Sequence, residues 1–420
     1  MTEFVIHDII VFLSNYKWIY DFKWTEIYNL GQWEKLPISW IKIFKDIDFN
    51  KLKKLLLCDF SVLEVPEDIQ NYFKFHNNIV NLIETLPSDF NHNFCLKDFK
   101  KINPKKSHEL MKISSFIRKH HKKPSLKVLD IGSGLGHLAR HLGNNFKFKC
   151  DIEILAVEGN PDLHLRNQCS ENVQKLQFFI TEDNLVEFNE KIEEISPKID
   201  LITGLHCCGK LSSLILQFFA NFSSADSLLL FSCCYHRMFQ QSLTGFPLSD
   251  IYKRELSNGN IDFISPAFLR LGCQERKETW LNWSADDFYH HRYSVAFRCA
   301  LESYSVGSDE DLSKLKRIKI KRKNLSEISF MDFAGCQIAA MEIRDKGRFL
   351  EMLEAQNKVC HWYSVMLVLQ ASIQEIIEYF ILLDRVLYLR QFPSMESVKL
   401  IRVFEPLISP RNIGIFVSKC

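Results

Sequence analysis

The segment 128–140 reads Val-Leu-Asp-Ile-Gly-Ser-Gly-Leu-Gly-His-Leu-Ala-Arg, and it joins an apolar run to a helical pattern through alternating glycines. The apolar run predicts a short, buried parallel strand, and its members are Leu126, Val128, Leu129 and Ile131. Apolar residues at helical spacing continue from Gly136 to Leu142. A glycine turn between such a strand and helix predicts a site for a nucleotide-like cofactor.

The spacing of the glycines distinguishes two cofactors. A dinucleotide motif needs G-x-G-x-x-G, but counting from Gly132 and Gly134 puts His137 at the third glycine position. Asp130 lies just before the turn, where its carboxylate would repel a pyrophosphate but accept hydrogen bonds from an ammonium group. S-adenosylmethionine carries that ammonium group and no phosphate. The sequence therefore predicts S-adenosylmethionine rather than NAD, with Asp130, Gly132, Ser133 and Gly134 as contacts.

Acidic residues end the next two apolar runs. Glu158 follows the apolar run 152–157, at the place where a carboxylate binds the ribose hydroxyls in a doubly wound sheet. A third run, which ends at Ile180, leads into the polar residues 182–184. One of these three is expected to meet the adenine edge, and Asp183 is the residue we choose.

Composition is that of an ordinary globular protein of two or three domains. The chain has 420 residues, of which 46% are hydrophobic and 25% charged, and its net charge is +2. So small a charge does not predict a general polyanion binder. No run approaches the roughly 20 apolar residues of a membrane span. The 13 cysteines lack the spacing of a secreted disulfide framework, and no leader pattern precedes them, so a cytoplasmic or nuclear protein is expected.

Four segments are expected along the chain. Residues 1–103 are predicted to be an aromatic-rich helical region, and residues 104–245 to alternate strands and helices as a Rossmann-like core. Residues 246–392 break that alternation with long helical patterns, which predicts a mainly helical insertion. Residues 393–420 contain two apolar runs, predicted to be a terminal strand pair completing the sheet.

The densest positive charge lies within the insertion, at 314–323, where seven of ten side chains are basic. This segment could be a solvated stretch without a ligand. It could equally contact an RNA backbone or act as a nuclear-import signal, and the sequence leaves these explanations open. Alternation of isoleucine with lysine in this segment also fits a charged edge strand.

Histidine and cysteine gather after two further predicted strands. Gly204-Leu-His-Cys-Cys-Gly209 follows a fourth strand and Ser232-Cys-Cys-Tyr-His236 a fifth. The carboxyl ends of neighbouring parallel strands share one crevice, so both loops should lie near the cofactor's methyl group. Gly204 and Leu205 are therefore predicted cofactor contacts. His206, His236 and Tyr235 are the predicted catalytic residues, although a structural role for each histidine is equally open.

A metal site among these cysteines is the less favoured interpretation. Cys207-Cys208 and Cys233-Cys234 lack the two-residue separation of zinc knuckles, and neighbours on a strand should point to opposite sides. The sequence thus predicts no obligate metal, with the cysteines acting as small buried side chains.

Several motifs together resemble the methyltransferase-like protein 25 family, which includes proteins once labelled as ribosomal RNA adenine dimethylase domain-containing. They span nearly the whole chain: the glycine turn, both histidine–cysteine loops, Trp33-Glu-Lys-Leu-Pro-Ile-Ser-Trp40, Pro104-Lys-Lys-Ser-His-Glu109 and Phe404-Glu-Pro-Leu-Ile-Ser-Pro-Arg-Asn412. Adenine dimethylases normally place an Asn-Pro-Pro-Tyr-like loop where this chain has Gly-Leu-His-Cys, so the resemblance does not carry that reaction with it.

The resemblance implies a class I S-adenosylmethionine-dependent methyltransferase fold, α/β with a mostly parallel seven-stranded sheet. It also draws attention to Lys105, Lys106, His108 and Glu109, which precede the first strand and could fold over the cofactor or the substrate. Lys105, Lys106 and His108 are the predicted substrate contacts, on a helix that Ser107 could cap. A solvated helix start is an equal alternative for these residues.

The function expected from the sequence is methyl transfer from S-adenosylmethionine to a macromolecule, with RNA slightly favoured over a protein side chain. A non-catalytic adaptor that keeps the cofactor fold is the rival from another class. Neither a membrane nor a metal partner is expected, and the sequence does not predict the oligomeric state.

Overall fold

The computed structural model describes residues 2–61, 64–89, 102–146, 151–167, 170–239, 242–258, 262–306, 327–339, 341 and 343–420. The chain forms two compact units. One, called here the sheet unit, comprises Met1–His7, Leu82–Gln274 and Ile377–Cys420. The other, the helical unit, comprises Asp8–Asn81 and Glu275–Ile376.

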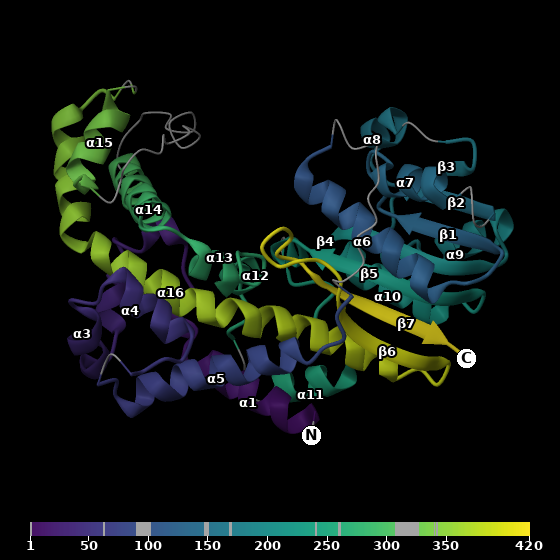
Figure 1. The fold of residues 1–420 in the computed structure, drawn as a ribbon, viewed down its shortest axis with the longest axis horizontal. Coiled ribbons are helices and arrows are strands. Elements are labelled where there is room, and N and C mark those ends of the chain that lie inside the picture. The colour runs from purple at the N-terminus through teal and green to yellow at the C-terminus, as the bar shows by residue number, and fades with distance from the viewer. Residues whose placement is uncertain are drawn as a thin grey trace. The chain divides into compact units, whose positions relative to one another are not determined.

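The sheet unit is built on a seven-stranded sheet with the order β3-β2-β1-β4-β5-β7-β6 (Figure 1). Neighbouring strands from β3 to β5 run parallel, whereas β7 is antiparallel to both β5 and β6. The strands are β1 (Ser125–Ile131), β2 (Asp151–Glu158), β3 (Val173–Gln177), β4 (Ile199–Cys208), β5 (Ala225–Cys233), β6 (Met395–Arg402) and β7 (Ile413–Lys419). The predicted mostly parallel sheet, closed by a terminal antiparallel pair, is confirmed.

Apolar side chains fill both faces of the central strands. Leu126 and Val128 join one core cluster with apolar residues of the helices before and after β1. The intervening Leu129 and Ile131 are also buried, because successive residues of a strand point to opposite faces. Helices cover the two faces of the sheet (Figure 1). A continuous apolar run is what a parallel strand buried on both faces requires.

The sheet unit's other elements connect these strands or follow β5. They are α6 (Pro104–His120), α7 (His137–Phe146), α8 (Pro161–Arg166), α9 (Leu185–Ile195), α10 (Leu211–Asn221), the 3-10 turn η3 (Tyr235–Met238), α11 (Asp250–Asn258) and α12 (Pro266–Leu271). Asn103, not Ser107, caps α6 by accepting the Lys105 backbone N–H at 2.9 Å. Pro104 at the first helical position explains the earlier start, since its fixed φ suits that place and it lacks an N–H.

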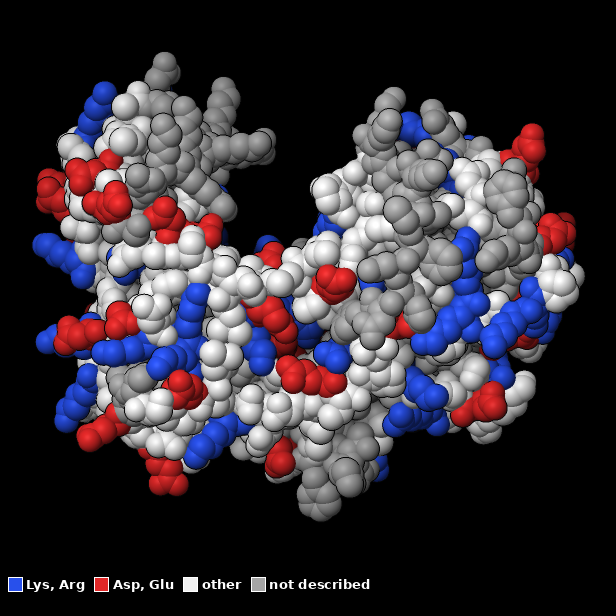
Figure 2. Space-filling view, viewed as in Figure 1, with Lys and Arg blue, Asp and Glu red and all other residues white. Residues whose placement is uncertain are grey.

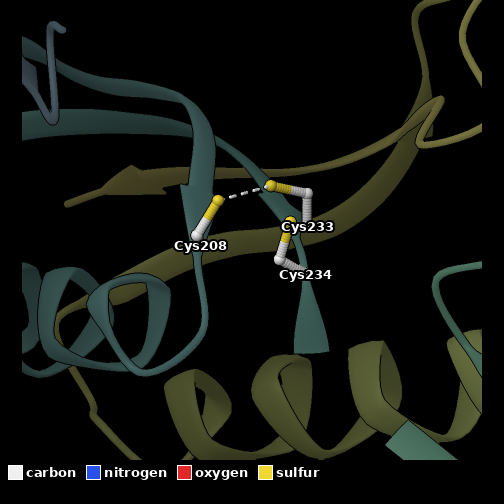
Figure 3. Close-up of side chains that lie close together, drawn as sticks. All are labelled: Cys208, Cys233 and Cys234. Carbon is white, nitrogen blue, oxygen red and sulfur yellow. Dashed lines mark hydrogen bonds between the residues drawn. The ribbon is translucent and has the colours of Figure 1, made fainter. Parts of the chain in front are cut away.

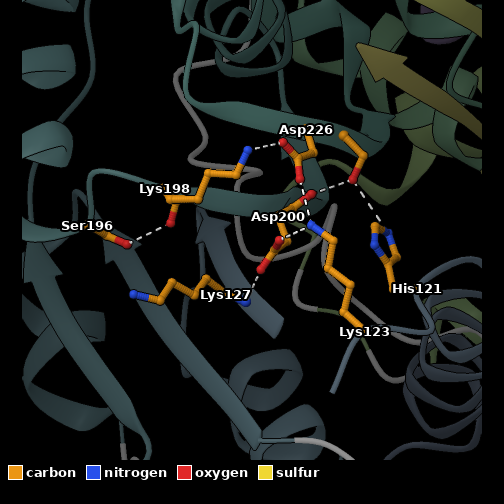
Figure 4. A network of polar contacts seen from close by, with 8 residues as sticks. His121, Lys123, Lys127, Ser196, Lys198, Asp200 and Asp226 are labelled. Atoms are coloured by element: carbon orange, nitrogen blue, oxygen red, sulfur yellow. Dashed lines mark hydrogen bonds and ion pairs between the residues drawn. The ribbon is translucent and has the colours of Figure 1, made fainter. Parts of the chain in front are cut away.

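A polar network joins the amino ends of β4 and β5 (Figure 4). The Lys123 ammonium group contacts the carboxylates of Asp200 and Asp226, and Lys198 pairs with Asp226 as well. Asp200 also accepts the Lys127 backbone N–H at 2.7 Å, which holds β1 beside β4. This network lies at the edge of the sheet opposite the glycine turn, so its charges position strands rather than ligands.

The helical unit contains the predicted aromatic N-terminal helices and most of the predicted insertion. Phe12, Tyr16, Trp40 and Tyr72 form one aromatic cluster with ring centroids 4.7–6.1 Å apart. The elements with residues in this unit are α1 (Thr2–Asn15), α2 (Lys17–Tyr20), η1 (Trp24–Glu26), η2 (Gln32–Lys35), α3 (Ile38–Phe44), α4 (Phe49–Leu56), α5 (Glu67–Glu84), α13 (Lys277–Asn282), α14 (Ala285–Ser305), α15 (Phe330–Ile338) and α16 (Lys346–Arg390).

Helix α16 corrects one expectation. Among the residues described, it is the one helix long and apolar enough to cross a membrane by length and composition. In its most apolar window 94% is buried inside the protein, as in the core helix of a globular fold. The sequence shows no apolar run of this length, because polar residues such as Gln374, Glu375 and Glu378 interrupt it. These polar side chains are buried as well.

The two units divide the chain at places other than the four segments expected from the sequence, and those segment boundaries stay a prediction. Residues 246–274, expected in the insertion, pack with the sheet unit, and the end of α16 does the same. The basic segment 314–323 lies outside the described residues.

Candidate functional site

The glycine turn after β1 has the backbone that its sequence requires. Gly132, Gly134 and Gly136 have φ values of +74°, +57° and +69°, a region that side chains with a Cβ disfavour. The backbone N–H groups of Gly132 and Ser133 both donate to the Val157 carbonyl, at 2.9 and 3.0 Å. The turn is therefore fastened to the end of β2 and opens at the carboxyl edge of the sheet.

Asp130 is the buried acid of this turn. It is 1% exposed, and burial raises the pKa of its carboxyl to about 7, with the nearby Glu158 charge acting in the same direction. Its Oδ2 atom is buried and has no hydrogen-bond partner within the described part of the chain, and the same holds for Ser133 Oγ. A buried acceptor without a donor is costly, so an incoming donor group would stabilise it.

Glu158, at the end of β2, faces the same turn. Its Oε2 accepts the Gly134 backbone N–H at 2.7 Å, and its Oε1 accepts that of Asn160 at 2.8 Å. Each carboxylate oxygen keeps a second lone pair, so the half-buried side chain can still accept hydroxyl groups. Asp183 lies exposed in the turn between β3 and α9. Its neighbour Asn184 binds the backbone at Thr181 and Phe179 and shapes that turn.

These residues fit S-adenosylmethionine. The unpartnered Asp130 oxygen suits the ammonium group of the methionine end, and Glu158 suits a ribose diol. A Cβ built on Gly134 would meet no atom within 4 Å, so space exists beside the turn. In contrast, a Cβ on Gly136 would lie 1.9 Å from Asn167 Oδ1, so this glycine serves close packing of α7.

The end of β4 differs from the predicted loop, because the strand continues to Cys208. Gly204 lies within it, where a Cβ would meet Cys207 Sγ at 2.4 Å and the Ile131 carbonyl at 3.2 Å. Leu205 packs half-buried against the core. The pairing of β4 with β5 shifts register between Leu205 and Cys207, and His206 between them has a φ of +61°. A bulge of this kind re-aims a side chain next to a site.

His206 is held by the carboxylate of Glu109, a residue of the 104–109 motif whose pairing with this histidine the sequence did not predict. Its Nε2 lies 2.9 Å from Glu109 Oε2, and Ser409 Oγ donates to Glu109 Oε1 at 2.6 Å. Burial raises the pKa of Glu109, but the hydrogen bond and charge of His206 and the Ser409 hydroxyl outweigh burial and leave this pKa below its usual value. Glu109 is therefore a carboxylate, and it fixes how the imidazole is oriented.

The other residues of the 104–109 motif lie around this pair. Lys105 is exposed, with its Nζ 4.0 Å from Glu109 Oε1. Burial lowers the pKa of Lys106, which also interacts with Glu109 and Arg140. His108 is buried, and its Nε2 accepts the Glu405 backbone N–H at 3.1 Å. His108 therefore fastens α6 to the 404–412 segment, and only the two lysines remain candidates to touch a substrate.

Tyr235 and His236, two of the predicted catalytic residues, follow β5 and differ in their surroundings. Tyr235 is 1% exposed, and the centre of the Arg385 guanidinium group lies 5.4 Å from its ring centroid. Burial raises the pKa of this tyrosine well above its usual value, so a packing role suits it better than proton transfer. His236 is half-buried, and burial lowers its pKa.

The cysteines corrected a second expectation, that neighbours would point to opposite sides. The sulfurs of Cys208, Cys233 and Cys234 all lie within 4.8 Å of one another. This was wrong for Cys233 and Cys234 because the strand ends at Cys233, and Cys234 adopts a left-handed φ of +50° that turns its side chain back. Cys207 does point elsewhere, with its sulfur 3.6 Å from the Ile131 carbonyl.

The chain was compared with families of known proteins and with solved structures. Residues 105–241 match a family model described as a methyltransferase domain. A solved structure of the plantazolicin methyltransferase BpumL with a triazolic desmethylPZN analog and SAH is 11% identical, with a TM-score of 0.24, over 44% of this chain and 60% of that one. A cyclopropane-fatty-acyl-phospholipid synthase-like protein from Lactobacillus casei is 12% identical, with a TM-score of 0.24, over 38% of this chain and 57% of that one. The chain thus spans less than two thirds of the length of either protein.

Proposed function

We propose that this chain, whose residues 105–241 are a domain of the S-adenosylmethionine-dependent methyltransferase class, transfers a methyl group to a macromolecular acceptor. The family model and the seven-stranded sheet order show a class I methyltransferase fold, and S-adenosylmethionine is the cofactor of that class. The acceptor and the roles of individual residues belong to the proposal, as does membership of the methyltransferase-like protein 25 family.

The observation that carries the proposal is the position of the Glu109–His206 pair relative to the cofactor turn. A Cβ on Gly132 would lie 4.0 Å from the sulfur of Cys207, the residue next to His206. The carboxyl ends of β1 and β4, which pair in parallel, therefore bring the glycine turn and the histidine to the same edge. An ordered imidazole at that edge supports proton removal from an acceptor while the cofactor supplies the methyl group.

The geometry supports a division of labour among the residues. Methyl transfer is an in-line displacement, so most of the catalysis would come from alignment of the acceptor. In the proposed arrangement Glu109 accepts a hydrogen bond from His206 Nε2–H, which leaves Nδ1 as the basic nitrogen. Glu109 is then a positioning residue that acts through the histidine, and His206 is the proposed base.

An RNA acceptor is favoured over a protein side chain because basic groups gather beside the turn. Lys106 and Arg140 both interact with His137, and Arg140 Nη2 lies 3.0 Å from His137 Nδ1. With the exposed Lys105, these groups could bind a phosphate backbone. On the face drawn in Figure 2, acidic and basic side chains are interspersed, so the proposal requires a local contact rather than a broad basic surface.

The test is partition of methyl label between RNA and protein. The full chain is incubated with methyl-labelled S-adenosylmethionine in two reactions, one with cellular RNA and one with cellular protein. Both fractions come from the cytoplasm or nucleus, where we propose that this protein is located. The proposal predicts label in RNA, which ribonuclease releases. Asp130→Asn should lose this label, and the control Glu190→Gln, at an exposed position of α9, should keep it. Label in protein alone would replace the RNA acceptor with a side chain, and no label with undetectable cofactor binding would favour the adaptor.

A further inference from the structure

Three thiol groups converge at the carboxyl ends of β4 and β5, and the proposed methyl transfer uses none of them. Figure 3 shows the sulfurs of Cys208, Cys233 and Cys234 turned toward one space. All three lie within 4.8 Å of one another, and those of Cys208 and Cys233 are 3.2 Å apart. Sulfur clusters of this size are the usual ligand sets of zinc and other soft ions.

The spacing of the sulfurs suits a tetrahedral ion. A zinc ion with Zn–S bonds of about 2.3 Å holds its thiolates about 3.8 Å apart. The observed separations, from 3.2 Å up to at most 4.8 Å, bracket that value, so changes of a few tenths of an ångström to about 1 Å would complete the geometry. Two of the thiols lie directly opposite each other, because Cys208 and Cys233 are paired residues of neighbouring strands.

A fourth donor lies close by on the chain. His236 follows Cys234 by two residues on η3, and the two side chains interact electrostatically. The Nδ1 atom of His236 is buried and has no hydrogen-bond partner in the part of the chain that the structure describes. The imidazole lies outside the group of sulfurs that are within 4.8 Å of one another, so it would have to turn toward them to make a set of three sulfurs and one nitrogen, one of the common structural zinc sets.

Two arginines interact with members of the cluster and with His236. Arg237 interacts electrostatically with Cys208 and Cys234, and both Arg237 and Arg270 interact with His236. A zinc ion bound by three thiolates and a neutral imidazole has a net charge of −1, which guanidinium groups stabilise.

We propose that Cys208, Cys233, Cys234 and His236 bind a zinc ion that fastens the end of β4 to the turn after β5. Binding replaces three thiol protons, which pass to solvent, and changes no oxidation state. The ion would stabilise the left-handed turn at Cys234 and the bulge that carries His206, two residues before Cys208. His236 is then a ligand, which leaves His206 as the base.

The test measures metal in the full chain, purified under reducing conditions. Zinc content is determined by elemental mass spectrometry, and the metal-free chain is titrated with Co²⁺, which shows thiolate charge-transfer absorption in a tetrahedral site. The expected result is one ion per chain. In Cys208→Ser and Cys234→Ser the affinity should fall by more than the roughly 10- to 100-fold that loss of an outer partner costs. Cys207→Ser, on the same strand but with its sulfur directed to Ile131, is the matched control and should bind as the wild type does.

Cofactor binding keeps this test separate from the proposed function. Each variant is titrated with S-adenosylmethionine, so that a variant which fails to fold is recognised by loss of that binding as well. Loss of metal with retained cofactor binding supports the zinc site. A metal-free chain that takes up neither Zn²⁺ nor Co²⁺, equal binding by all cysteine variants, or a resting Cys208–Cys233 disulfide found by peptide mapping would each overturn it.

Discussion

The raised pKa of Asp130 predicts how cofactor affinity depends on pH. Burial raises the pKa of this carboxyl to about 7, so near neutral pH the cofactor-free protein is a mixture of protonated and ionised forms. Only the ionised form accepts hydrogen bonds from an ammonium group in full, so at lower pH binding must first expel a proton. Affinity for S-adenosylmethionine therefore rises with pH. For a pKa of about 7, the ionised fraction grows from about 9% at about pH 6 to about 76% at about pH 7.5, an eightfold gain or so.

Isothermal titration calorimetry across this range measures the effect. In Asp130→Asn the affinity should become independent of pH and fall by about 1.5–3 kcal/mol, or about 10- to 150-fold, because a hydrogen bond to a charged group is lost. The same raised pKa lowers stability as pH increases from the ordinary carboxyl range toward 7, since the folded state binds the proton more tightly than the unfolded state. A wild-type affinity that is flat or falls with pH, or an Asp130→Asn variant with the wild-type slope, would refute the reasoning.

Three other substitutions test the architecture around the site. Glu109→Gln should lower kcat by about 10²- to 10⁴-fold with little change in cofactor affinity, because an amide that donates to His206 moves the imidazole proton to the other nitrogen. Steady-state methylation measures kcat and calorimetry measures cofactor affinity. An unchanged kcat would contradict the assigned role. Gly136→Ala should cost about 1–3 kcal/mol in urea unfolding, since its φ of +69° disfavours a Cβ and Asn167 occupies the space; equal stability would show that the turn relaxes. Asp384→Ala should lower the free energy of unfolding by about 2–6 kcal/mol, because it leaves the buried backbone N–H groups of residues 248 and 249 without their acceptor. Thermal unfolding measures this loss, with Asp250→Asn at an exposed position as the control. A loss no larger than that of the control would contradict the prediction.

The fold class could be predicted from the sequence because its signals are local. An apolar run, an acid and alternating glycines stand within about a dozen neighbouring positions, and strand, turn and helix follow from them. The fold class is confirmed, and the match to a methyltransferase domain agrees with the predicted cofactor. The roles of Asp130, Gly132, Ser133, Gly134 and Glu158 stay predictions that their geometry supports.

The remaining features depend on contacts between distant parts of the chain. Glu109 and Ser409 are 300 positions apart, and no local pattern indicates that Ser409 binds Glu109 or that Glu109 binds His206. The two motifs that contain these residues were found through their resemblance to a known family. That resemblance was the one signal in the sequence that they could belong to a common site. Likewise, alternation along a strand misplaced Cys234, because a single left-handed residue after the strand reverses the direction of its side chain.

Direct titration of the full chain with S-adenosylmethionine tests the central claim most directly. The account predicts one bound cofactor per chain at about pH 7.5, displaced by S-adenosylhomocysteine and not by NAD, with the binding weakened by Asp130→Asn. Undetectable binding of S-adenosylmethionine by folded protein, or tighter binding of NAD, would contradict it.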